Sequence, residues 1–230
     1  MKFIIIGLGT FGASLAQQLT KAGHEVIGID TDMSKVDAFK EIISYTICMD
    51  ATDELTVAGL PLQNTDVVIV AIGRKYQGEN IMVTAVMKNA KVKRLISRAI
   101  SPLHEKVLQA IGVDEIVRPE QETADRWAKK LSLHHVVDSF QLNENHSIIE
   151  TNVPEGYAGK TIQEVNLRSK YNLLALTLIK KVEVQGNMGE SEVQTQIQGV
   201  ASAHTVLEAD SILVLYGANK DLNLFLTEEF

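Results

Sequence analysis

The chain has 230 residues, enough for one large domain or for two smaller domains with separate cores. Its 22 basic and 29 acidic side chains give a net charge of -7, which repels nucleic-acid backbones and anionic lipid headgroups, so nucleic acid is not expected as a partner. The single cysteine, Cys48, excludes an internal disulfide and a cysteine-rich metal site, and this fits a reducing cytoplasm.

Short β-branched runs alternate with stretches of helical period from residue 1 to about residue 118. The run 67–72 is apolar at every position, which a strand tolerates when helices cover both faces of its sheet. The apolar run 3–6 is far too short to span a membrane, so direct insertion is not expected. The pattern predicts an α/β domain with a doubly wound parallel sheet. The expected strands are 2–6, 25–30, 44–49, 66–72, 94–98 and 114–117, and the expected helices are 10–22, 33–40, 53–59, 77–90 and 102–111.

The pattern changes after Pro119. Residues 120–133 predict one helix, whose apolar stripe includes Trp127 and Leu131, and we interpret it as a connector. Strand-like runs separated by turn residues then predict a smaller α+β domain. Its expected strands are 136–142, 146–152, 173–184, 193–198 and 211–216, and its expected helices are 160–165 and 219–227.

A glycine-rich loop, residues 7–12, follows the first expected strand and opens the first expected helix. Gly7 permits a tight turn, Gly9 lets a pyrophosphate approach the backbone, and Gly12 lets the helix pack closely on the strand. The free N–H groups and the positive end of the helix bind phosphates without a lysine. The loop therefore predicts a nucleotide-phosphate site that also includes Thr10 and Phe11.

Asp30 ends the second expected strand, where a carboxylate accepts both hydroxyls of an adenosine ribose. Neither Thr31, Asp32 nor Met33 supplies a cation for a 2′-phosphate, so we expect NAD(H), ATP, ADP or AMP rather than NADP. Either aspartate fits the N-cap of the helix 33–40. We assign the cap to Asp32 and the ribose to Asp30.

The third expected strand is followed by Asp50, Ala51 and Thr52, which fit the adenine side of a crevice at the carboxyl ends of the strands. An equally good interpretation makes Thr52 or Asp53 a helix cap. Both interpretations stay open at this point.

The fourth expected strand ends in Ala71, Ile72 and Gly73, whose small residues leave room beside the phosphates. Arg98 ends the fifth strand, where it is either a solvated charge or a group that faces the crevice. Glu120 lies in the first turn of the connector helix, which the helix dipole alone favours.

Six segments carry a resemblance that covers nearly the whole chain: IIIGLGTFGASLAQQLTKAGHEVIGIDTD, DATD, VVIVAIG, HEKVLQAIGVDEIVRPE, VNLRSKYNLLALTL and LEADSILVLYG. Their order resembles the KTN/RCK family, in particular the stand-alone gating subunits of bacterial Ktr and Trk potassium uptake systems. The resemblance implies a Rossmann-like domain over 1–118, a crossover helix over 119–135 and an RCK C-terminal domain over 136–230. It also implies dimers that assemble into an octameric ring on an integral-membrane potassium channel, at the inner face of the plasma membrane.

The same resemblance implies roles for the candidate residues. The three loop glycines would hold phosphates, Asp30 the ribose, and Arg98 the phosphate side of the crevice. Asp50 and Thr52 would lie at the base, and Glu120 resembles the carboxylate that binds an activating divalent cation, Mg²⁺ or Ca²⁺, beside the nucleotide.

Two segments of the chain depart from the family pattern. Thr10 stands where Ktr-type subunits commonly carry an arginine, so a preference for ATP over ADP is open, as are NAD(H) and AMP. Arg168 lies in a stretch comparable to one that binds cyclic di-AMP in some relatives. Leu174 and Ala175 replace the polar and bulky contacts expected there, so we do not expect that ligand.

Two other classes compete with a regulator. A small NAD-dependent oxidoreductase needs a general acid or base at the nicotinamide, and His24 and His104 are poor candidates that we expect to be surface or packing residues. Cys48, within an apolar strand, is expected to be a small core residue. A scaffold protein with a vestigial glycine loop would bind no nucleotide.

Overall fold

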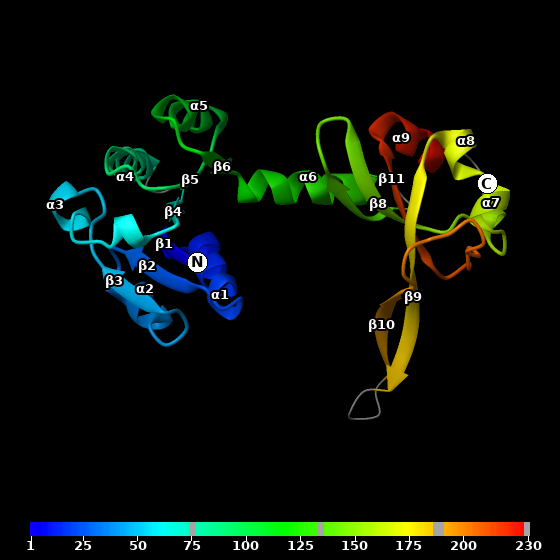
Figure 1. Cartoon of the computed structure of the whole chain (residues 1–230), viewed down its shortest axis with the longest axis horizontal. Helices are drawn as coiled ribbons and strands as arrows, with labels where there is room; N and C mark the ends of the chain where they lie inside the picture. Colours follow the sequence, from blue (N-terminus) through cyan, green and yellow to red (C-terminus); the bar gives the residue numbers. More distant parts are fainter. Residues whose placement is uncertain (74–76, 133–135, 186–190, 228–230) are drawn as a thin grey trace. The chain divides into compact units, whose positions relative to one another are not determined.

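The chain divides into two units, Met1–Gln121 and Glu122–Phe230, in the computed structural model of Figure 1. Helix α6 (Pro119–Ser132) spans the division, and the last three residues of the predicted connector lie outside the described residues. No helix within the described ranges combines the length and apolar character that a bilayer crossing requires. The structure describes residues 1–73, 77–132, 136–185 and 191–227.

The first unit alternates strands and helices as the sequence predicts. Its strands are β1 (Lys2–Ile6), β2 (Glu25–Asp30), β3 (Tyr45–Cys48), β4 (Val67–Val70), β5 (Leu95–Arg98) and β6 (Glu115–Val117). Its helices are α1 (Thr10–Lys21), α2 (Met33–Phe39), α3 (Glu54–Val57), α4 (Gln77–Asn89) and α5 (Pro102–Ile111), with a 3₁₀ turn, η1 (Leu62–Asn64). The strands form one parallel sheet in the order β3-β2-β1-β4-β5-β6. The chain therefore leaves β1 in one direction and returns to its other side at β4, which creates a switch point between them.

Both faces of this sheet are buried, as the continuous apolar runs require. Ile4 and Ile6 of β1 join an apolar cluster with Met87 of α4, whereas Ile5 joins a second cluster with Ala16 of α1. Successive side chains of a strand point to opposite faces, so one tripeptide supplies both cores. Each fully buried isoleucine contributes about 1.5–3 kcal/mol. The predicted doubly wound parallel sheet is confirmed.

The second unit is an antiparallel sheet with short helices. Its strands are β7 (Val136–Gln141), β8 (His146–Asn152), β9 (Leu174–Gln185), β10 (Ser191–Ile197) and β11 (Ile212–Ala218). Its other elements are η3 (Glu155–Tyr157), α7 (Ile162–Val165), α8 (Leu167–Tyr171) and α9 (Asn219–Thr227). The strand order is β10-β9-β11-β8-β7, and every pairing is antiparallel.

A separate core holds this second unit together. Phe225 of α9 stacks on Tyr157 and meets the ring of Tyr171 edge-on, with centroid distances of 6.2 and 5.3 Å. The two tyrosine hydroxyls share a hydrogen bond of 2.7 Å, so their buried polar ends are partnered. Strands, helices and a core of their own confirm the predicted small α+β fold for this part of the chain.

Candidate functional site

A crevice of about 300 Å³ lies at the carboxyl ends of β1, β2, β3 and β4. Parallel strands in a doubly wound sheet place ligands at this end, beside the switch point. The volume is at the lower end of the range for small-molecule sites. Ten of the residues singled out from the sequence line it: Gly7, Gly9, Asp30, Thr31, Asp50, Ala51, Thr52, Ala71, Ile72 and Gly73.

The three loop glycines differ in what a side chain at each position would meet. Gly7 has a φ of 102°, which favours glycine, and an added Cβ would lie 3.0 Å from the backbone nitrogen of Ile72. An added Cβ on Gly12 would lie 2.0 Å from the carbonyl oxygen of Gly7, so Gly12 is required for α1 to pack on the loop. Gly9 is open, because nothing lies within 4 Å of an added Cβ. Gly9 is also the N-cap of α1, and no side chain caps the N–H groups at the start of this helix, next to the crevice.

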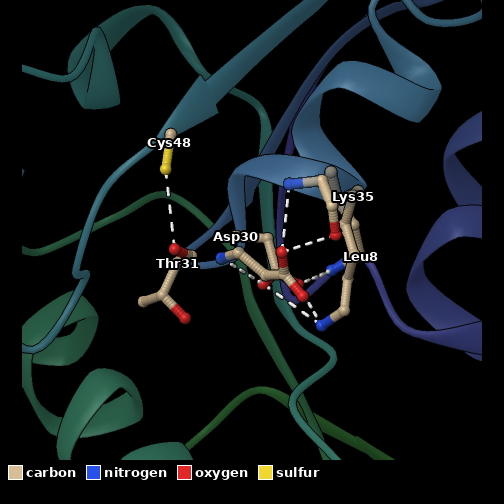
Figure 2. Close-up of polar contacts among 7 residues, drawn as sticks. Leu8, Asp30, Thr31, Lys35 and Cys48 are labelled. Carbon is tan, nitrogen blue, oxygen red and sulfur yellow. Dashed lines mark hydrogen bonds and ion pairs between the residues drawn. The ribbon is translucent and has the colours of Figure 1, made fainter.

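Asp30 is the most buried carboxylate at this site, with 8% of its surface exposed. Its Oδ2 accepts the backbone N–H of Leu8 at 2.8 Å, and its Oδ1 accepts that of Asp32 at 3.0 Å. Figure 2 shows that the Lys35 ammonium also points at this carboxylate, with Nζ 3.2 Å from Oδ1 and 3.1 Å from Oδ2. The carboxylate is thus fixed in orientation between the glycine loop and α2.

Sequence reasoning missed Lys35. The argument against a 2′-phosphate considered only the three residues after Asp30, whereas Lys35 lies in the first turn of α2 and still lines the crevice. A residue in the first turn of a helix that begins at the crevice can reach back to the strand end before it. The place of Lys35 in the first turn of the helix after Asp30 was the signal in the sequence.

The aspartate caps are settled by the structure. Asp32 caps α2 by accepting the Ser34 N–H at 3.0 Å, as predicted, and the hydrogen bond from the Ser34 hydroxyl is the main cause of its lowered pKa. Asp53 caps α3, and the hydrogen bond from Thr56 lowers the pKa of that carboxyl. Thr52 is therefore not the cap of α3.

Asp50 and Thr52 form a local turn on the crevice wall. The N–H and the hydroxyl of Thr52 both donate to Oδ1 of Asp50, at 2.9 and 2.8 Å. Asp50 is exposed, and both residues line the crevice. The turn presents a carboxylate and a hydroxyl oxygen to a ligand, and both can accept hydrogen bonds from the amino group of an adenine base.

Four residues predicted to bind the nucleotide do not line the crevice: Thr10, Phe11, Gly12 and Arg98. The Arg98 guanidinium lies 5.8 Å from the centroid of the Phe11 ring and pairs with Glu120. Its side chain is 12% exposed, and its Nε has no hydrogen-bond partner among the described residues. An added Cβ on Gly73 would lie 3.4 Å from Arg98 Nη1, so Arg98 adjoins the wall of the crevice rather than forming it.

Asn80 on α4 hydrogen-bonds to the chain at the ends of β4 and β5, and sequence reasoning also missed it. It is fully buried, and its Nδ2 donates to the carbonyl oxygens of Ile72 at 3.2 Å and Arg98 at 3.4 Å. Its Oδ1 accepts from the Ser97 hydroxyl at 3.2 Å. An asparagine in an otherwise apolar helical stripe was the signal, because a buried amide needs partners.

Glu120 alone does not fit a complete cation site. Its side chain is 67% exposed and paired with Arg98, and the described ranges contain no group of three histidine, cysteine, aspartate or glutamate residues placed to hold a metal ion. Mg²⁺ takes six ligands and Ca²⁺ takes six to eight, mostly oxygen. A cation at Glu120 would need ligands from a nucleotide or from another subunit.

Residues 3–119 match the family model of the TrkA-N domain. The whole chain is 35% identical to the Ktr system potassium uptake protein C of Bacillus subtilis, over 97% of this chain and 95% of that protein. The chain belongs to the TrkA-N family of potassium uptake proteins. It is also 30% identical to the Ktr system potassium uptake protein A of the same organism, over 99% of this chain and 96% of that protein. The KTN/RCK resemblance is confirmed.

Solved structures agree on the fold of this TrkA-N protein. The GsuK RCK domain superimposes with a TM-score of 0.65 at 20% identity, over 99% of this chain and 48% of that chain. A GsuK channel bound to NAD gives a TM-score of 0.65 at 19% identity, over 99% of this chain and 39% of that chain. The chain therefore spans less than half the length of these structures, and the likeness confirms a Rossmann-like domain followed by an RCK C-terminal domain.

The acid–base candidates of an oxidoreductase lie away from the crevice of the TrkA-N protein. His104 is 1% exposed, neither ring nitrogen has a hydrogen-bond partner among the described residues, and burial lowers its pKa. His104 is therefore the packing residue expected. The expectation for Cys48 was wrong: the residue is exposed, since β3 is an edge strand, and its thiol donates to the Thr31 carbonyl at 3.5 Å.

The buried His104 predicts acid sensitivity of the TrkA-N protein. Because its folded-state pKa is lowered, the unfolded chain takes up a proton first as the pH falls below about 6.5. We expect the free energy of unfolding to fall by up to about 1.4 kcal/mol per pH unit below that point. His104→Leu should flatten the slope, measured by urea unfolding at pH 7 and pH 5.5. Equal slopes in the two proteins would contradict this role.

Proposed function

We propose that the chain is the nucleotide-binding regulatory subunit of a potassium uptake system. It binds an adenine nucleotide in the crevice of the first unit and thereby controls a potassium-transporting membrane protein. The observation that carries the proposal is the crevice itself, in which a glycine loop at a helix start and a fixed carboxylate meet at the switch point. The end-to-end similarity to Ktr proteins supplies the potassium system.

The proposal assigns each part of the nucleotide to a part of the crevice. The phosphates lie along Gly7 and Gly9 at the start of α1, where N–H groups and the helix dipole favour negative charge. The ribose lies at Asp30, and the base lies near Asp50 and Thr52. The candidate ligands are ADP, ATP, AMP and NAD(H), and NAD in one GsuK channel structure supports a ligand of this class.

Arg98 is the proposed sensor of the outer phosphates. Its guanidinium borders Gly73, keeps one buried nitrogen without a partner among the described residues, and is held by Phe11 and Glu120. A phosphate that pairs with Arg98 competes with Glu120 for it, so different nucleotides stabilise different positions of this side chain. A cation at Glu120 is proposed together with further ligands from a nucleotide or from a second subunit.

The proposed assembly is a homo-oligomer, built from dimers into an octameric ring at the inner face of the plasma membrane. Trp127 and Leu131 of α6 support association, because they are 52% and 75% exposed and form an apolar surface that a second copy can cover. A ligand that prefers one state tenfold supplies about 1.4 kcal/mol per site, and four such sites reach the roughly 5.5 kcal/mol of a near-complete switch.

The chain is proposed to be a binding protein rather than an enzyme. Hydride transfer needs a proton donor or acceptor beside the nicotinamide, and histidine or tyrosine commonly fills that role. The described residues that line the crevice include neither. Steady NADH consumption with any small keto or hydroxy substrate would favour the oxidoreductase instead.

Potassium uptake in cells tests the proposed function. We expect a strain that lacks the gene to take up potassium more slowly at low external potassium, and the wild-type gene to restore the rate. Lys40→Met, an exposed change outside the crevice, should restore it equally well. Uptake that is the same with and without the gene would contradict the regulatory role.

A further inference from the structure

The carboxylate of Asp30 uses its full hydrogen-bonding capacity in this structure. It accepts two backbone N–H groups, from Leu8 and Asp32, and both of its oxygens contact the Lys35 ammonium (Figure 2). An ionised carboxylate offers about four acceptor positions. A ribose that donates two hydroxyls to Asp30 must therefore replace donors that already contact it.

Lys35 is the donor that can leave. The Leu8 N–H belongs to a loop residue that is 2% exposed, and the Asp32 N–H belongs to the N-cap of α2, so both are fixed by the fold. The Lys35 side chain is 39% exposed and carries its ammonium group on a flexible four-carbon stem. Its ammonium can move away from Asp30 and stay in the crevice.

Among the described residues that line the crevice, Lys35 is also the only one with a basic side chain. The other charged residues there are Asp30, Asp32, Asp50 and Glu79. Without Lys35, a phosphate on the 2′ oxygen of a ribose held at Asp30 would meet carboxylates alone. With Lys35 beside that carboxylate, the same phosphate meets a cation that can leave Asp30 and pair with it.

We propose that Lys35 determines which ribose the crevice accepts: it competes with an unmodified 2′,3′-diol for Asp30 and pairs with a phosphate carried on the 2′ oxygen. The proposal rests on the proposed nucleotide site and adds 2′-phosphorylated adenosine nucleotides to its candidate ligands. Both effects act in one direction, toward 2′-phosphorylated adenosine. They reverse the sequence-based expectation that no cation is present for a 2′-phosphate.

The test compares two probes that differ by one phosphate, AMP and adenosine 2′,5′-bisphosphate, by calorimetry on the full chain. The measured quantity is the Kd of the bisphosphate divided by the Kd of AMP. We expect Lys35→Met, which keeps the length of the stem, to raise this ratio at least tenfold, equivalent to about 1.4 kcal/mol. Lys40→Met, which removes an exposed charge at the end of the same helix, should leave the ratio at the wild-type value.

A conservative variant guards against misfolding. Lys35→Arg keeps the cation, so its ratio should stay within about threefold of wild type. An unchanged ratio in Lys35→Met, or a wild-type protein that binds AMP and rejects the bisphosphate altogether, would overturn the role of Lys35 while leaving the nucleotide site intact. Wild-type protein that binds neither probe would overturn the nucleotide site itself, and the role of Lys35 with it.

Discussion

Replacing Gly9 with aspartate is expected to weaken adenine-nucleotide binding at least a hundredfold, about 2.7 kcal/mol, while the protein stays folded. An added Cβ at Gly9 meets nothing within 4 Å, and the backbone there is extended, so the new side chain fits. Aspartate is a preferred N-cap and should stabilise α1 by a few tenths of a kcal/mol relative to glycine. The same carboxylate occupies the phosphate position and repels it.

The opposite signs of these two effects make the variant informative. Calorimetry with ADP measures the binding loss, and urea unfolding measures the change in stability. Gly9→Asn is the matched control, since it caps the helix without a charge and should retain affinity within about tenfold of wild type. Wild-type ADP affinity in Gly9→Asp would show that phosphates do not bind at this helix start.

Gly12→Ala is expected to destabilise the first unit by about 3 kcal/mol or more and to reduce nucleotide binding as a consequence. The added Cβ would lie 2.0 Å from the Gly7 carbonyl oxygen and 3.0 Å from the Ala71 Cβ. Because the nearer atom is backbone, α1 must move away from β1 or the loop must change shape. Either movement disturbs the glycine loop and the helix start beside the crevice.

Gly78→Ala is the control for this second variant, because it also places a methyl group near the start of a helix but in open space. It should leave stability within about 1 kcal/mol of wild type, on the stabilising side. Thermal and urea unfolding of the three proteins provide the comparison. A Gly12→Ala protein as stable as Gly78→Ala would mean that α1 does not pack on the loop as described.

Long, strongly patterned elements could be predicted from the sequence. β1, β2 and α5 begin and end at the predicted residues because each combines a clear apolar pattern with a glycine, proline or charged boundary. Helix α8 was missed because it has only five residues. The asparagines that flank it, Asn166 and Asn172, have φ values of 53° and 57°. Asparagine tolerates this left-handed conformation, but its presence alone does not predict it.

The same limit of prediction from the sequence applies to the candidate site. Positions on strand ends could be predicted because parallel strands deliver them to one edge of the sheet. Lys35, Asn80 and the contact between Arg98 and Phe11 depend on how helices reach back across that edge, which sequence spacing does not specify. The domain boundaries at 118 and 135 and the cation at Glu120 stay predictions.

The most direct measurement is calorimetric titration of the purified, nucleotide-stripped chain with ADP, ATP, AMP, NADH and NADPH. The account predicts that at least one of them binds with one site per chain, and that Gly9→Asp removes the heat of binding. No binding of any of the five at millimolar concentration would contradict the claim that this crevice is a nucleotide site.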